Sequence, residues 1–118
     1  MKLRPLLYIG LLSLATLPPL AMAAKDDPQA DALNRRLATL QNDPQASDVA
    51  RFERLQAQQS VAALSEAKRR DRDALLFLAD RRVEIAERTA RTALARRELD
   101  RLESTRNDLL IEASRRDA

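Results

Sequence analysis

Residues 73–95 read DALLFLADRRVEIAERTARTALA, and this stretch carries the clearest periodicity in the chain. Its apolar residues recur at alternating spacings of three and four, which is the pattern of a helix that packs against another helix. This apolar stripe consists of Leu76, Ala79, Val83, Ala86, Ala90 and Ala93. Because most of these side chains are small, a partner helix can approach closely. The stretch therefore predicts a helix with a narrow packing face.

The same helix is expected to continue from about residue 73 to about residue 118. Residues 45–118 contain neither glycine nor proline, and they are rich in the strong helix formers Ala, Leu, Arg and Glu. Beyond residue 93 the apolar positions change register, as an inserted stutter would produce. The shifted stripe consists of Leu99, Leu102, Leu109 and Ala113. This composition lacks turn chemistry, so it excludes a β-rich fold.

Residues 24–46 are expected to form a short helix and a linker. Asp27 before Pro28 is typical of a helix N-cap followed by proline at the first helical position. The helix would present Leu33, Leu37 and Leu40 on one face and end near Gln41. The sequence Asn42-Asp43-Pro44 then breaks it.

A second helix is expected over about residues 47–67, with Asp43 or Ser47 as its N-cap. Its predicted apolar face consists of Phe52, Leu55, Ala62, Ala63 and Ala67. Residues 68–73 are six consecutive charged residues, and they interrupt the helical spacing of the apolar residues. They therefore predict a turn between two helices. The alternative is a solvated bend within one continuous helix. Residues 47–118 would thus form an antiparallel helical hairpin or coiled coil in an all-α protein, with a short N-terminal helix and one long C-terminal helix.

The first 23 residues have the order of a cleavable secretory signal peptide. Lys2 and Arg4 precede an uncharged apolar run over residues 6–17, and Ala21-Met22-Ala23 is a small-x-small cleavage site. The run is too short for a transmembrane helix, which needs about 20 apolar residues. We therefore predict cleavage after Ala23 and export to the periplasm, and an uncleaved anchor is the alternative. The chain contains no cysteine, which excludes a lipoprotein.

Removal of this segment changes the charge balance of the protein. The chain has 21 basic and 18 acidic residues, and two of the basic ones lie in the signal segment, so the mature net charge is 19 minus 18, or +1. The Arg-Arg doublets of the mature chain alternate with acids and leave no continuous basic stripe. Nucleic acid is therefore not an expected partner.

The residue inventory argues against an enzyme. There is no His, Cys or Trp in the chain, so metal sites lose their commonest ligands and nucleophilic triads lose their usual base. Asp26 and Asp27 read as solvated terminal charges, as do Asp71 and Asp73 among their basic neighbours. We therefore assign no catalytic, cofactor-binding or metal-binding residue, and no cofactor.

Two strings in the chain resemble a known domain family. They are LFLADRRVEIA at residues 76–86 and LLIEASRRDA at residues 109–118. They are similar to the helical domain of unknown function that precedes OmpA-like peptidoglycan-binding domains in Gram-negative envelope proteins. The resemblance covers roughly residues 33–118 and implies a non-catalytic module of the cell envelope.

This sequence differs from those relatives because it lacks their lipobox cysteine and ends at Ala118. We expect a shortened gene product, or a domain separated from its partner. Binding to peptidoglycan would require a domain outside this chain.

A length mismatch predicts where a partner would bind. At 1.5 Å per residue the third helix is about 65 to 70 Å long, whereas the second reaches only about 30 Å. The region from about residue 95 to residue 118 should therefore extend beyond its partner helix. The candidate interface residues there are Leu99, Leu102, Leu109, Leu110 and Ile111. The alternative is that the short first helix folds over them.

Three functional classes follow from this pattern. The preferred one is an exported structural or scaffolding module that binds an envelope protein, or a second copy of itself, through helix packing. A periplasmic chaperone of the holdase type, which binds many unfolded clients, is the alternative. An enzyme is the third and least favoured class.

Overall fold

The computed structural model describes residues 26–118, which form three helices. These are α1 (Pro28–Asn42), α2 (Arg51–Ser65) and α3 (Arg72–Asp117). No strand occurs among the described residues, and the predicted all-α class is confirmed. The predicted signal segment and cleavage site lie outside them. No helix between residues 26 and 118 combines the length and apolar character needed to cross a membrane.

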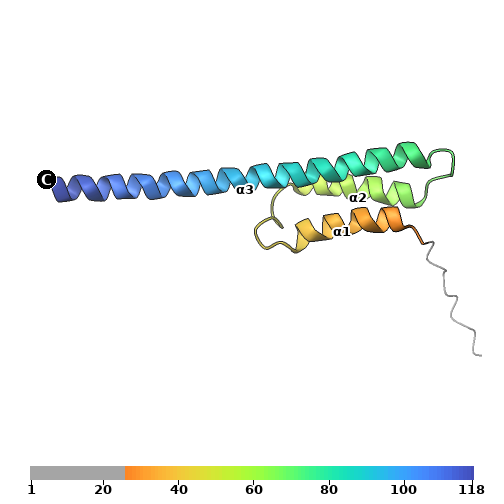
Figure 1. Ribbon diagram of the computed structural model, residues 1–118, viewed down its shortest axis with the longest axis horizontal. Helices are drawn as coiled ribbons and strands as arrows, with labels where there is room; N and C mark the ends of the chain where they lie inside the picture. Colours follow the sequence, from red (N-terminus) through yellow and green to blue (C-terminus); the bar gives the residue numbers. More distant parts are fainter. Residues whose placement is uncertain (1–25) are drawn as a thin grey trace, which may run out of the picture.

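The helices form a small antiparallel bundle from which α3 projects (Figure 1). The chain reverses direction at residues 43–50 and again at residues 66–71, so α2 runs against both α1 and α3. All three pairs of helices are in contact. We call the three-helix part the body and residues 95–118 the distal arm.

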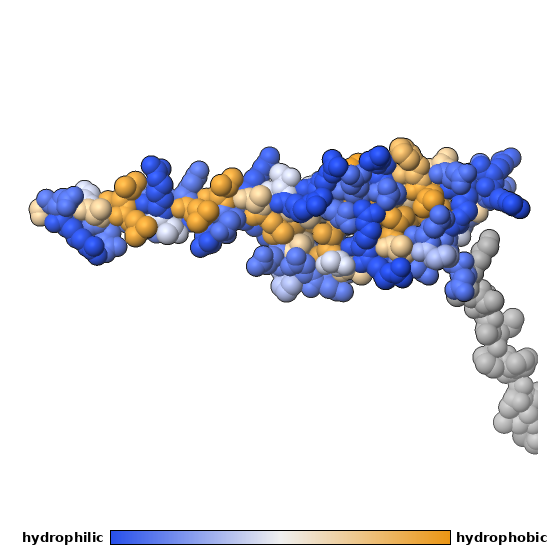
Figure 2. Space-filling model, viewed as in Figure 1, coloured by the Kyte–Doolittle hydropathy of each residue, from blue (hydrophilic) through white to orange (hydrophobic). Residues whose placement is uncertain are grey.

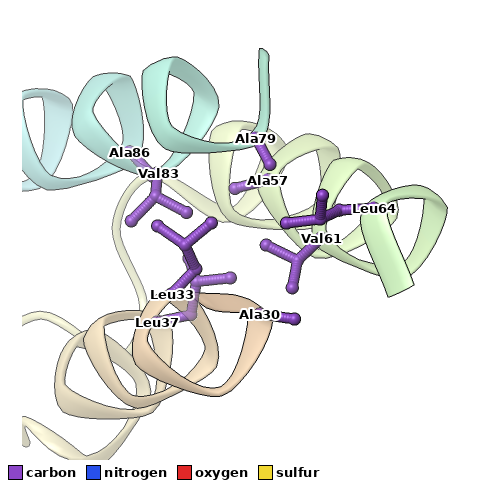
Figure 3. Close-up of a cluster of buried hydrophobic side chains, with 9 residues drawn as sticks. All are labelled: Ala30, Leu33, Leu37, Ala57, Val61, Leu64, Ala79, Val83 and Ala86. Carbon is purple, nitrogen blue, oxygen red and sulfur yellow. The ribbon is translucent and has the colours of Figure 1, made fainter. Parts of the chain in front are cut away.

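The core of the body is built from small and medium apolar side chains. Each helix contributes three of them, and in Figure 3 they point toward one another. The members are Ala30, Leu33 and Leu37 of α1, Ala57, Val61 and Leu64 of α2, and Ala79, Val83 and Ala86 of α3. The apolar stripe predicted for α1 and the part of the α3 stripe that belongs to the body therefore lie in the core or against it. The alanines allow the close approach of helices that their spacing predicted.

The start of α1 follows from its sequence. Asp27 is the N-cap, and its carboxylate accepts a hydrogen bond from the backbone N–H of Ala30 at 3.1 Å, with Pro28 in the first turn. Arg72, at the start of α3, also donates to Asp27, with its Nη1 3.0 Å from Oδ2. The interpretation of Asp27 as a solvated terminal charge was therefore wrong. This carboxylate joins the beginnings of α1 and α3.

The apolar face predicted for α2 was wrong. Phe52 and Leu55 are exposed, whereas Ala57, Val61 and Leu64 are buried. The second helix carries apolar residues on both sides, and its contacts with α1 and α3 select the side that bears Val61 and Leu64. The periodicity of α2 alone contains no information about the position of its two neighbours.

The start predicted for α2 was also wrong. Residues 43–50 form turns, and the N-cap is Ala50 in a left-handed conformation, with φ of 52° and no side-chain cap. Asp43 instead accepts a hydrogen bond from the backbone N–H of Gln45 at 2.9 Å. Ala46 and Val49 of this connection are buried against Ala90 of α3. Their burial makes the connection a second, smaller part of the core.

Candidate interaction surface

The distal arm is a single helix with no intramolecular cover. Every residue from 95 to 118 is exposed, although α3 continues without a break to Asp117. The first helix ends at Asn42, and its last apolar residue, Leu40, packs against the same small cluster as Ala93 and Leu94, before the arm begins. The alternative that α1 folds over the arm is therefore wrong. Figure 2 shows apolar side chains along the arm among charged ones, with no other element over them on that face.

All five candidate interface residues lie on this arm, and each exposes about half of its surface. The exposed fractions range from 49 % for Leu102 to 60 % for Leu109. The other three, with intermediate values, are Leu99, Leu110 and Ile111. An apolar group of this density, exposed to water along a rigid element, is typical of an interaction surface.

The five residues do not share one face of the helix. At about 100° per residue, Leu99, Leu102 and Leu109 form one stripe, and Leu110 lies at its edge. Ile111 points to the opposite side. The stripe itself lies about 140° around α3 from the buried face at Ala79 and Val83. The arm therefore presents its leucines away from the side on which α1 and α2 pack.

Sequence reasoning missed two further members of this exposed face. Leu78 and Ile85 of the body are 43 % and 47 % exposed. Both precede Leu99 by multiples of seven residues, so at about 20° of drift per heptad Ile85 lies about 40° and Leu78 about 60° around α3 from Leu99, with Leu78 toward the groove beside α2. The seven-residue spacing was the signal that could have identified them. The exposed apolar face thus extends beyond the arm into the body.

The base of the arm is attached to the turn region by one ion pair. Arg97 Nη2 lies 2.8 Å from Asp48 Oδ2, and Arg97 Nη1 lies 3.1 Å from Asp48 Oδ1. The same guanidinium donates to the backbone carbonyl of Gln45 at 3.3 Å. The hydrogen bond from Arg97 lowers the pKa of the Asp48 carboxyl. This contact orients α3 where it leaves the body.

Farther along the arm, ion pairs connect neighbouring turns of the helix. Arg101 donates to Glu98 over three residues at 2.9 Å through Nε, and this bond lowers the pKa of Glu98. Arg116 pairs with Glu112 over four residues. Such exposed pairs add a few tenths of a kcal/mol each to helix stability. They help to explain how the arm can stay helical without tertiary packing.

The described residues contain no group of His, Cys, Asp and Glu that could hold a metal ion. Asp71 pairs with Arg70 at 3.4 Å, and Asp73 lies in the first turn of α3, so both have basic or helix-terminal surroundings. Ser47 is exposed in the turn region, and Ser60 lies on α2. These positions do not converge on a common site.

An open groove lies between α1 and α3. It is lined by Ala32 and Leu33 on one side and by Leu76 and Phe77 on the other. The ring of Phe77 is exposed, and the guanidinium of Arg81 lies over it, 5.4 Å from the ring centroid. Charged side chains border the groove as well: Asp73, and Arg36 with Asp80, whose Oδ1 lies 2.8 Å from Nη1 of Arg36.

No protein family model matches the chain, and comparisons with curated proteins and with solved structures found no match. The resemblance to the helical domain that precedes OmpA-like domains therefore stays a prediction.

Proposed function

We propose that this protein is an exported, non-enzymatic scaffolding module of the cell envelope, and that it binds protein partners through the distal arm. The observation that supports this proposal is the exposed stripe of Leu99, Leu102 and Leu109 on a helix with no intramolecular cover. A free helix with an apolar stripe gains burial when a second helix packs along it. The body would hold the base of the arm in place.

The proposed compartment rests on the sequence. The basic start, the short apolar run and the Ala21-Met22-Ala23 site are typical of a segment that directs export. We expect mass spectrometry of the protein from the periplasmic fraction to give an N-terminus at Ala24. Recovery of a chain that still carries Met1 in the membrane fraction would contradict this processing.

The partner surface can be tested by site-specific photo-crosslinking in cells. A photoreactive residue at Leu102 or Leu109 should give one or two defined adducts. The matched control is Asp108, which is exposed on the same arm but points away from the leucine stripe. Equal labelling from all three positions, or none from the two leucine positions, would contradict the proposal.

The same experiment separates a scaffold from a holdase. A holdase would give a broad distribution of adducts from Leu102 and Leu109, and the purified protein would suppress aggregation of several unfolded test proteins. A scaffold should do neither. When the photoreactive residue stands at Leu99 of the same stripe, the additional changes Leu102→Ser/Leu109→Ser should remove the defined adducts while circular dichroism stays helical, because neither leucine contributes to the core of the body.

A further inference from the structure

The outward face of α3 carries a seven-residue repeat that the body does not cover. Counting from Leu78, the first position of the repeat recurs at Ile85, Thr92, Leu99, Arg106 and Ala113. The position three residues later supplies the apolar residues Ala95, Leu102 and Leu109, with Arg81 and Arg88 before them and Arg116 after them. These are the two inward-facing positions of a two-stranded coiled coil. From Thr92 onward all of them are exposed.

This face is sterically free along most of α3. The first helix contacts α3 on the side of Asp80 and Glu87, both of which bind Arg36. The second helix contacts it on the side of Arg82, whose Nη1 donates to Gln56 at 2.6 Å. The repeat lies between these two sides, on the surface opposite the core. A second long helix can therefore lie along it without meeting the body.

We propose that the occupant of this face is a second copy of the chain, paired as an antiparallel coiled coil. Leu99 of each copy packs against Leu102 of the other. The overlap then runs from about residue 83 to residue 118, or about 53 Å at 1.5 Å per residue. Each body lies on the outer side of the pair. This inference deepens the proposed function, on which it rests, by naming the partner of the arm.

Charge complementarity selects this arrangement. In an antiparallel coiled coil, the heptad positions that flank the apolar seam of one helix lie opposite the same heptad positions of the other helix. In the register above, Arg96 meets Glu103 of the second copy, and Arg91 meets Glu112. Each contact occurs twice because of the twofold symmetry. Among the described residues, Arg91, Arg96 and Glu103 form no ion pair within their own chain, whereas Glu112 pairs with Arg116 and would share its carboxylate with Arg91 of the second copy.

Other registers bring like charges together. A shift of one heptad in one direction places Glu103 opposite Glu103 of the second copy, and a shift in the other direction places Arg96 opposite Arg96. A parallel in-register pair is worse, because its flanking contacts are Arg91 with Arg96 and Glu98 with Glu103. It would also place both Arg106 side chains together in the seam. Like charges at flanking positions disfavour a pairing.

The absence of cysteine makes the register directly measurable. In the variant Arg96→Cys/Glu103→Cys, mild oxidation of the chain that begins at Ala24 should produce a covalent dimer. The two positions are seven residues apart in one helix, about 10 Å along its axis, so they cannot bond within a chain. Either single variant places its cysteine about 10 Å from its symmetry mate and should stay mostly uncrosslinked. Efficient crosslinking by a single variant would overturn the antiparallel register.

Charge reversal tests the same contact without oxidation. In sedimentation equilibrium, Arg96→Glu should raise the dissociation constant of the dimer by about tenfold, and Glu103→Arg should do the same. The double reversal should restore association to near the original level. The control Asp108→Arg, on the opposite side of the arm, should change it little. A wild-type chain that stays monomeric at about 100 µM would overturn the dimer, whereas defined photo-adducts of other proteins at Leu102 would still support the proposed function.

Discussion

The guanidinium of Arg36 is the main polar connection between α1 and α3. Its Nε and Nη2 donate to the carboxylate of Glu87 at 2.9 and 2.7 Å, and its Nη1 donates to Asp80 at 2.8 Å. These hydrogen bonds, first of all those with Glu87, raise the pKa of Arg36. Glu87 also has Arg91 four residues later in the same helix, which is the spacing at which an acid and a base commonly pair within a helix. A contact across 51 residues has no local pattern from which it could be predicted.

The pairing of Glu87 makes stability depend on pH. The hydrogen bond from Arg36 lowers the pKa of folded Glu87 below its ordinary value of 4.5. Its contribution is therefore complete above about pH 4.5 and is lost as the pH falls through the folded pKa. We expect Glu87→Gln to cost about 1 kcal/mol at pH 7 and progressively less below pH 4.5. Thermal melts of both proteins between pH 7 and pH 3 measure this difference, and a gap that is constant with pH would contradict the assignment.

Leu64 and Leu55 of α2 provide a matched test of which side of that helix is buried. Leu64 is fully buried, whereas Leu55 is 52 % exposed. Leu64→Ala should lower the free energy of unfolding by about 2 to 4 kcal/mol, because it leaves a cavity in the core. Leu55→Ala should change it by about 0.5 kcal/mol or less. Chemical denaturation followed by circular dichroism would show the reverse order if the face first predicted from the sequence were the buried one.

At the scale of the element, the backbone path of the preceding connection sets the first residue of α2. No capping side chain sets it. Ala46 and Val49 pack against Ala90, and this packing holds the connection close to α3. The chain enters α2 from there through Ala50, which has a positive φ of 52°. A non-glycine residue in this conformation costs about 1 to 2 kcal/mol. Burial in the connection offsets that cost.

The strain at Ala50 predicts opposite effects of two substitutions. Ala50→Gly should stabilise the protein by up to about 1 kcal/mol, because glycine adopts the left-handed conformation without a steric penalty. Ala50→Val should destabilise it by more than 1 kcal/mol, because a β-branched residue is strongly disfavoured there. Denaturation midpoints of the two variants test this. Equal stability of both would show that α2 can start without the left-handed residue.

At the scale of the whole molecule, the body and the arm should differ in local stability. The three helices of the body are held together by a core, whereas residues 102–118 are all exposed to solvent. In the monomer, backbone amides of the arm should exchange with deuterium orders of magnitude faster than those around Val83. Exchange measured at low and high protein concentration tests this, and association should slow exchange most strongly in the arm. Equal protection at high dilution would contradict an uncovered arm.

Truncation provides an independent test at the same scale. A chain that ends at Arg101 retains the core of the body and the ion pair between Arg97 and Asp48. Under monomeric conditions its free energy of unfolding should differ from that of the full chain by about 0.5 kcal/mol or less. The melting temperature of the full chain should rise with concentration, and that of the truncated chain should not. Loss of folding on truncation would place the arm in the intramolecular core.

Four features were predictable from the amino-acid sequence: the helical class, the N-cap at Asp27, the buried stripe of α3 and the uncovered arm. Each of these depends on local propensity, on spacing within one helix or on the lengths of helices. The tertiary structure decided which side of α2 is buried, why α2 starts at Arg51 and that Arg36 binds Glu87. These features depend on where the neighbouring helices lie. When a helix carries apolar residues on two sides, contact with its neighbours determines which side is buried and loses its contact with water.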